Sequence, residues 1–118
     1  MGVDIKLVNR ISTKIVTVDH HSEGGQYVLS GIDLAKLYIT YNYSEVYKLL
    51  ENYQGMVETF DGKKASDLLP WLEKGVEKLG VERYKDYWAP TPGNAGYALS
   101  ILLEWAKQYP DAIFEAEG

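Results

Sequence analysis

The order of two hydrophobic periodicities constrains the fold of this chain more than any other feature of its sequence. Apolar and polar residues alternate in residues 3–8 and again in residues 33–44, a pattern typical of half-buried strands. In residues 68–79 and 95–109 the apolar residues recur every three or four positions, which is typical of amphipathic helices. Because the strands come first and the helices later, the sequence predicts an α+β fold rather than repeated βαβ units.

We expect a small antiparallel sheet of about four to five strands, with two or three helices packed on one face. The expected strands are residues 3–8, 14–18, 27–30, 33–44 and 112–117, and the first two should form a hairpin over residues 3–19. The expected helices are residues 45–53, 68–79 and 95–109, and residues 81–90 should form a short helix or a turn.

Residues that favour helix ends bound the three expected helices. Ser44, Asp67 and Asn94 are expected N-caps, because their side-chain oxygens can accept a hydrogen bond from a free backbone N–H. Pro70 would then lie in the first turn of its helix, where the missing N–H has no intrahelical partner to lose. Gly80 is the expected C-cap of the same helix.

Bulk properties limit the class of protein. The length of 118 residues and the hydrophobic fraction of 46% predict one globular domain over residues 1–118. A formal net charge of −5 argues against nonspecific nucleic-acid binding, and the absence of cysteine from the sequence excludes disulfides and zinc–cysteine sites. Residues 1–12 lack the apolar core of a signal peptide, and no apolar run approaches a membrane span. We therefore expect a soluble, cytoplasmic protein that does not bind membranes.

The stretch "TPGNAG", residues 91–96, can be interpreted in two ways. Free N–H groups at the start of a helix favour anions, and Gly93 and Gly96 would let a ligand approach the backbone. Alternatively, the stretch is an ordinary helix start, in which Asn94 caps, Pro92 stiffens and the glycines turn the chain. It is not a P-loop, because no Gly-Lys-Ser/Thr follows. The capped start is favoured, and the phosphate site stays open.

Signals for catalysis and for metal binding are weak. Asp19, His20, His21 and Glu23 are neighbours in the sequence, but adjacent residues of a strand point to opposite faces. No HExxH motif or similar metal-ligand spacing is present, and no GxSxG motif accompanies the two histidines. We expect no metal, no cofactor and no enzymatic activity, and a small hydrolase that uses His20 or His21 is the least favoured alternative.

Three stretches together resemble a family of small uncharacterised proteins encoded by tailed phages and prophages. They are "ITYNYSEVYKLL", "KASDLLPWLEKGVEKL" and "YWAPTPGNAGYALSILLEWAKQYPDAIFE", and the likeness covers residues 38–114. The matching positions are Thr40, Asn42, Asp67, Leu68, Leu69, Pro70, Gly75, Gly93, Gly96, Tyr97, Pro110, Asp111 and Ala112. The chain departs from the family at Tyr41, where histidine is frequent, and at Asn94 and Ala95, where the family's glycines usually flank a tryptophan. The resemblance implies a phage-associated context in a bacterial host and no established reaction.

Aromatic and amide side chains supply the candidate site. Tyr and Trp faces stack on flat rings, and Asn and Tyr offer hydrogen-bond donors and acceptors. The expected ligand-binding residues are Tyr41, Asn42, Tyr43, Trp88, Thr91, Gly93, Asn94, Gly96 and Tyr97. They predict a non-enzymatic binding protein that holds or sequesters a nucleotide-derived molecule, with a role in counter-defence. The alternative is a structural or interaction protein whose Tyr and Trp surface contacts a host protein or forms a homo-oligomer.

Overall fold

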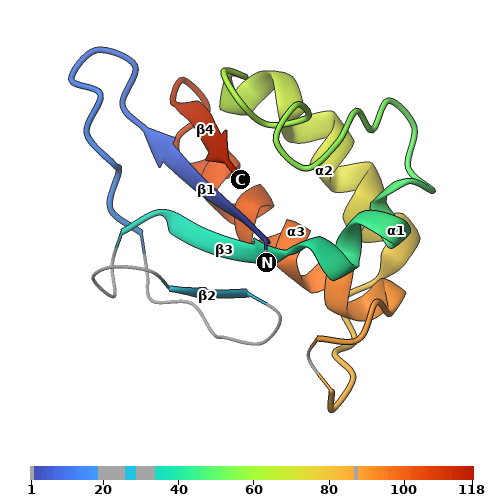
Figure 1. Cartoon of the computed structure of the whole chain (residues 1–118). Coiled ribbons are helices and arrows are strands. Elements are labelled where there is room, and N and C mark those ends of the chain that lie inside the picture. Colours follow the sequence, from blue (N-terminus) through green and yellow to red (C-terminus); the bar gives the residue numbers. More distant parts are fainter. Residues whose placement is uncertain (1, 19–25, 29–33, 87) are drawn as a thin grey trace.

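An antiparallel sheet and a layer of helices make up the fold (Figure 1). The computed structural model describes residues 2–18, 26–28, 34–86 and 88–118. The strands are β1 (Gly2–Val8), β2 (Gln26–Val28), β3 (Lys36–Thr40) and β4 (Ile113–Glu117), in the order β2-β3-β1-β4. The helices are the 3-10 helix η1 (Tyr41–Tyr43), α1 (Ser44–Tyr47), α2 (Ala65–Leu79) and α3 (Pro92–Gln108). The predicted α+β class is confirmed.

Three strands form the body of the sheet. β1, β3 and β4 each have at least five residues, whereas β2 is a three-residue segment that pairs with β3 at the edge. Within the described residues, the sheet therefore has three strands of five residues or more, and the expected four to five are not found there. The expected strand 14–18 makes only isolated bridges. Of the expected hairpin over 3–19, the described residues keep a turn closed by the N–H of Asn9 and the carbonyl oxygen of Lys14, the bridge between Val8 and Ile15, and a bond from the N–H of Val16 to the carbonyl oxygen of Leu7. β1 cannot pair with that strand along its length, because β3 and β4 occupy its two sides.

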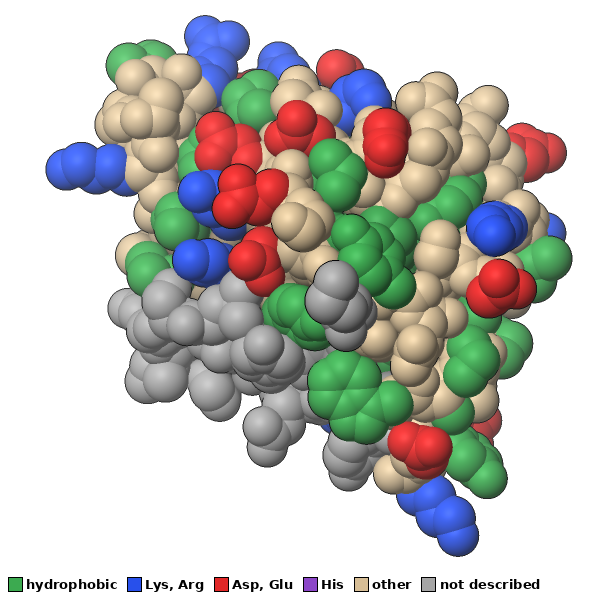
Figure 2. Space-filling model, viewed as in Figure 1, with side chains coloured by type: hydrophobic (Ala, Val, Ile, Leu, Met, Phe, Trp, Pro, Cys, Tyr) green, Lys and Arg blue, Asp and Glu red, His purple; other side chains and the backbone are tan. Residues whose placement is uncertain are grey.

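The two faces of the sheet differ in chemistry, as the alternation in β1 predicts. Val3, Ile5 and Leu7 are fully buried beneath the helices. On the open face, acidic and basic side chains lie next to one another (Figure 2), and the Lys6 ammonium is 3.5 Å from a carboxylate oxygen of Glu115 on β4. An antiparallel sheet with one covered and one solvated face accounts for this pattern.

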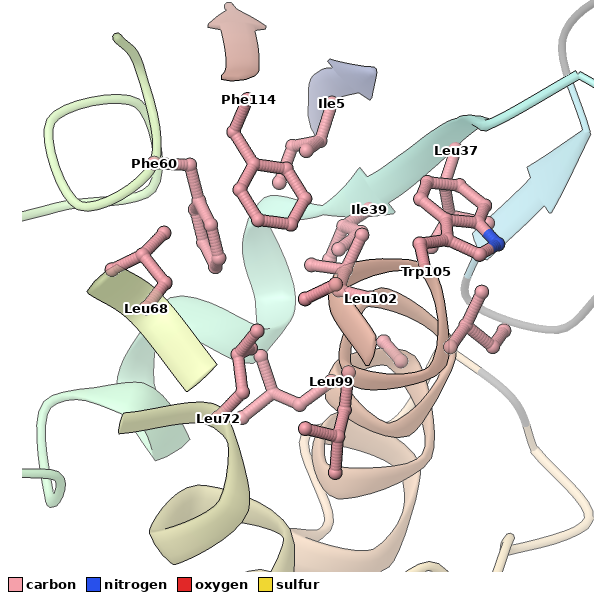
Figure 3. Packing of buried hydrophobic residues seen from close by; sticks show 14 of the residues in the cluster. Ile5, Leu37, Ile39, Phe60, Leu68, Leu72, Leu99, Leu102, Trp105 and Phe114 are labelled. Atoms are coloured by element: carbon pink, nitrogen blue, oxygen red, sulfur yellow. The ribbon is translucent and has the colours of Figure 1, made fainter. Parts of the chain in front are cut away.

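The core lies between the sheet and the pair α2 and α3 (Figure 3). Leu72 of α2 and Leu99 of α3 point toward each other, and Leu102 reaches the strands. Close approach of the helices depends on Gly75, because a Cβ atom there would lie 2.9 Å from Cδ1 of Leu99. Phe60 closes one end of this core and packs against Phe114 of β4, with the ring centroids 6.0 Å apart.

The helical segment after β3 differs from the expected helix 45–53. The chain leaves the strand at Thr40, whose hydroxyl accepts a hydrogen bond from the N–H of Asn42, so Ser44 is not an N-cap. The α-helical segment ends at Tyr47, and the chain turns through Asn52, which has a φ of 63°. Leu49, expected on the buried stripe, is 62% exposed because the helix does not continue through it.

Both long helices begin before their expected first residues. α2 starts at Ala65, so Asp67 lies in its first turn instead of capping it, and Pro70 lies inside the helix. α3 starts at Pro92, and its N-cap is Thr91 rather than Asn94. Gly80 is confirmed as the C-cap of α2, with a φ of 75°. Residues 81–86 and 88–90 form no helix: residues 85, 86, 88 and 89 lie in turns or bends, and the others are irregular, so the turn is the alternative that fits.

The outer edge of β4 is covered by the chain itself. β4 is an edge strand of the sheet, as predicted. Its outward-facing backbone groups, with those of the preceding Ala112, are hydrogen-bonded to residues 62–65 at 2.8–2.9 Å. The N–H of Ala116 donates to Oδ1 of Asp61 over 3.0 Å. An edge strand normally leaves such groups open to another chain, and here both backbone groups of Phe114 and the N–H of Ala116 have partners.

Candidate functional site

The end of β3 and the loop before α3, which the sequence places 46 residues apart, lie in direct contact. The Nδ2 group of Asn42 donates a hydrogen bond to the carbonyl oxygen of Trp88 over 2.8 Å. The buried hydroxyl of Tyr47 donates to the carbonyl oxygen of Ala95 over 2.9 Å. The two segments expected to share a ligand thus use these polar groups to bind each other.

Asn94 holds the loop that precedes α3. Its side chain is 2% exposed, and its Oδ1 atom accepts a hydrogen bond from the N–H of Tyr84 over 2.8 Å. Its Nδ2 group donates to the carbonyl oxygens of Asp86 and Ala89, each over 3.0 Å. Since an amide has two donor hydrogens and one acceptor oxygen, all three functions of this group have partners within the protein.

The glycines of the loop allow the protein's own backbone to approach α3. A Cβ atom on Gly93 would overlap the carbonyl oxygen of Glu82, and one on Gly96 would overlap the carbonyl oxygen of Gly80. The segment after α2 therefore occupies the space where a ligand would meet these glycines. Their role in the fold is close packing between two backbone segments.

The start of α3 offers few free donors to an anion. Thr91 caps the helix, with its Oγ1 atom accepting from the N–H of Asn94 over 3.1 Å. The N–H of Ala95 donates to the carbonyl oxygen of Thr91, and Pro92 has no N–H. A phosphate cradle needs several convergent N–H groups, so this geometry supports the capped helix start.

The predicted aromatic residues divide into buried and exposed groups. Tyr43 is buried, and Tyr97 is half-buried beneath the guanidinium of Arg83, which lies 4.6 Å from the ring centroid. Tyr41 and Trp88 are 41% and 47% exposed. Only the last two present large faces to solvent, and a ligand-binding role for the set stays a prediction.

A cluster of tyrosines fixes η1 and α1 against the core. The ring centroid of Tyr47 is 6.3 Å from that of Tyr43 and 6.0 Å from that of Tyr53. Complete burial, followed by the neighbouring Tyr43 and Tyr53, raises the pKa of Tyr47 well above 10.0. Burial also raises the pKa of Tyr53, although its hydrogen bond with Ser44 acts in the opposite direction. Both phenols are therefore neutral at physiological pH.

A cleft lies along α2. The turn of residues 49–52 runs beside α2 (Figure 1), joined to it by two hydrogen bonds. Nε1 of Trp71 donates to the carbonyl oxygen of Glu51 over 2.7 Å, and Nζ of Lys78 donates to that of Leu49 over 3.0 Å. Between these two segments lies a cleft of about 480 Å³. Its lining residues are Leu50, Glu51, Asn52, Asp67, Pro70, Trp71, Lys74, Gly75 and Lys78.

The lining of this α2 cleft combines an apolar floor with charged walls. Leu50, Pro70 and Trp71 supply the apolar surface. Two acidic and two basic side chains line the walls, and they are Glu51, Asp67, Lys74 and Lys78. A smaller hollow of about 240 Å³ shares Asn52, Asp67 and Trp71 with the cleft and extends past the tryptophan. The arrangement suits a small molecule with an apolar body and charged groups.

Sequence reasoning missed the residues of the α2 cleft. The apolar stripe of residues 68–79 indicates only the side of the helix that faces the core, whereas Lys74 and Lys78 are exposed and lie one turn apart. The available signal for the cleft is this i, i+4 pair of lysines beside Trp71, whose indole N–H can donate a hydrogen bond. The opposite wall could not be expected, because residues 49–52 were assigned to a helix that ends at Tyr47 in the structure.

The charged face of the sheet contains a second polar hollow, of about 390 Å³. It is lined by both acidic and basic side chains of β1, β3 and β4.

Among the described residues, no group of three or more His, Asp or Glu side chains is arranged to hold a metal ion. Asp19, His20, His21 and Glu23, the metal and hydrolase candidates, lie outside the described residues. Within residues 2–18, 26–28, 34–86 and 88–118, no helix combines the length and apolar character needed to cross a bilayer.

Comparison of the chain with family models, with curated proteins and with solved structures finds no match. The resemblance to phage-encoded proteins therefore stays an expectation.

Proposed function

We propose that this chain is a non-enzymatic binding protein that holds a small organic molecule in the α2 cleft. The observation that carries the proposal is the cleft itself, a hollow of about 480 Å³ with an apolar floor and charged walls. Ligand sites are typically concave, with volumes of roughly 300–1,000 Å³ and a few polar groups on an apolar lining. The site expected at the start of α3 has weaker support, because Asn94, Gly93 and Gly96 contact the protein's own backbone there.

Rigid support of the cleft walls strengthens this proposal. One wall is α2, which packs through Leu72 and Gly75 against α3. The other wall, residues 49–52, is fixed to α2 by the side chains of Trp71 and Lys78. A site whose walls are fixed before binding loses less conformational entropy when a ligand enters. Sequestration of a host nucleotide, the role expected from the sequence, is one form of this function.

A ligand screen monitored by thermal shift and by amide NMR tests the proposal. We expect a bound compound to raise the melting temperature, since only the folded state has the cleft. The largest NMR shifts should lie in residues 50–52 and 67–78. The screen contains mono- and cyclic nucleotides, amino acids and short peptides. Shifts centred on Asn42 and Gly93 instead, or the absence of binding by every compound, would contradict the proposed site.

A matched pair of variants locates the binding. Lys74→Trp places a large ring at the cleft and should abolish binding. Lys107→Trp makes the same change at an exposed position of α3 that lines neither hollow, and it should bind as the wild type does. Equal binding by the two variants would place the ligand elsewhere.

A second candidate function is supported by three exposed aromatic side chains. Tyr41, Tyr84 and Trp88 are 41%, 51% and 47% exposed, and such residues are enriched in protein interfaces. They favour the alternative of an interaction protein that forms a homo-oligomer. Sedimentation velocity over a range of concentrations tests it. A dimer weakened by Tyr84→Ser and Trp88→Ser supports this function, and a monomer at millimolar concentration contradicts it.

A further inference from the structure

The α2 cleft is acidic at one end and basic at the other. Glu51 lies opposite Trp71, and Leu49 lies opposite Lys78, so the 49–52 turn runs antiparallel to α2. Asp67 lies toward the N-terminus of the helix, at one end of the cleft, and Lys74 and Lys78 lie toward the other end. Glu51 lies between them, because its carbonyl oxygen is bonded to Trp71, four residues from Asp67 and three from Lys74. The two lysines are therefore separated along the cleft from the carboxylate of Asp67.

The length of the helix gives the spacing of the two ends. At a rise of about 1.5 Å per residue, Asp67 and Lys74 are roughly 10 Å apart along the axis. Lys78 lies one further turn along, roughly 16 Å from Asp67. The apolar surface of Leu50, Pro70 and Trp71 lies between the charged ends.

The charged groups of the cleft remain available to a ligand. The carboxylates of Asp67 and Glu51 and the ammonium of Lys74 make no hydrogen bond or ion pair with another described residue. Lys78 donates to one carbonyl oxygen, which leaves two of its three ammonium hydrogens. By contrast, the nearby Lys64 lies 3.5 Å from a carboxylate oxygen of Asp111.

We propose that the ligand of the α2 cleft is a zwitterion, with a cationic group at the Asp67 end, an anionic group at the Lys74 end and an apolar body between them. This inference rests on the proposed function of the cleft and names the chemical class of its ligand. A simple anion fits less well, because the four wall charges sum to zero and the whole chain carries −5, which repels anions. A free peptide of three residues fits, since an extended chain spans about 3.3–3.6 Å per residue.

Three forms of one tripeptide test the charge at each end. The probe is unblocked Ala-Phe-Ala, compared with its N-acetyl form and its C-terminal amide by NMR titration at low ionic strength. We expect acetylation and amidation each to weaken binding about two- to five-fold, the range for exposed ion pairs. High salt should reduce both differences, because ions screen exposed charges.

Paired variants assign each effect to a residue. Lys74→Gln should reduce the preference for the free carboxylate, since Lys78 remains, and keep the preference for the free amine. Asp67→Asn should instead reduce the preference for the free amine and keep the preference for the free carboxylate. Lys107→Gln and Glu104→Gln, which change exposed charges of α3 outside both hollows, should keep both preferences.

Equal affinity for the three peptide forms would overturn the zwitterion proposal, as would the absence of binding by the unblocked peptide. The proposed function has a separate test, because it fails only if no compound of the wider screen shifts the NMR signals of the cleft. A compound that binds there through one charge alone would keep the function and reject the zwitterion.

Discussion

Replacement of Asn94 by alanine separates a structural role for the loop before α3 from a ligand-binding role. Asn94→Ala removes three hydrogen bonds from a buried amide, to Tyr84, Asp86 and Ala89. At about 0.5–1.5 kcal/mol net for each bond, the free energy of unfolding should fall by about 2–4 kcal/mol. With an unfolding entropy of about 2.1 cal/mol/K per residue, a chain of 118 residues should lose about 8–16 °C in melting temperature.

Urea and thermal unfolding, followed by far-UV circular dichroism, measure this loss. Asn42→Ala is the matched control, because that exposed amide makes one bond to the same loop, at Trp88, and its loss should cost about 1 kcal/mol or less. A loss below about 0.5 kcal/mol for Asn94→Ala would refute the structural argument. Unchanged stability with lost ligand binding would instead favour the ligand site expected from the sequence.

Three further substitutions test the packing and the electrostatics. Gly96→Ala places a methyl group on the carbonyl oxygen of Gly80 and should lower the free energy of unfolding, measured by urea titration, by at least about 2 kcal/mol. A loss below about 0.5 kcal/mol would show that the two backbone segments can move apart at little cost in free energy. Because the pKa of Tyr47 is raised in the folded state, its phenol ionises first in the unfolded state, so stability should fall as pH rises above about 10, by up to about 1.4 kcal/mol per pH unit. Tyr47→Phe should flatten that fall between pH 9.5 and 11.5, and an unchanged slope would contradict the assignment. Pro70→Ala restores an N–H that can donate to the carbonyl oxygen of Ser66, so it should raise the melting temperature by an amount that corresponds to about 1 kcal/mol. An unchanged melting temperature would show that the helix accommodates the proline without a cost in stability.

Periodicity predicted the elements that pack by one regular face. The alternation in residues 3–8 identified β1 and its buried side, and the apolar positions of residues 95–109 identified most of the buried face of α3. These predictions depend on a spacing that neighbouring elements do not alter. Gly80 was predictable for a similar reason, since a helix that ends in a left-handed residue favours glycine.

Predictions that depended on a capping side chain were less successful. Asn94 can serve as an N-cap by residue type, but tertiary contacts give its amide three partners in the loop, and Thr91 caps the helix instead. The same applies to Ser44. The hydroxyl of Thr40, earlier in the chain, already caps the helical segment by accepting a hydrogen bond from the N–H of Asn42. A cap preference is local, and a nearby competing residue can supply the same hydrogen bond.

The α2 cleft could not be derived from the sequence because it lies between two segments whose contact is tertiary. Nothing in the pattern of residues 49–52 indicates that their carbonyl oxygens will accept from Trp71 and Lys78. The glycine-rich stretch before α3 was the more visible signal, and its glycines serve a contact with residues 80 and 82. Glycine alone shows that something approaches the backbone closely, and it does not show whether that group is a ligand or another part of the chain.

The covering of the β4 edge limits how copies of this protein can associate. A fibre that grows by adding strands needs a sheet edge whose amide and carbonyl groups are free, and residues 61–65 already bind both backbone groups of Phe114 and the N–H of Ala116. Recruitment of a new strand there requires this segment to detach first, with the loss of its bonds to the strand and of the Asp61 contact. Resistance to aggregation on this side of the molecule is therefore governed by how often that short stretch opens.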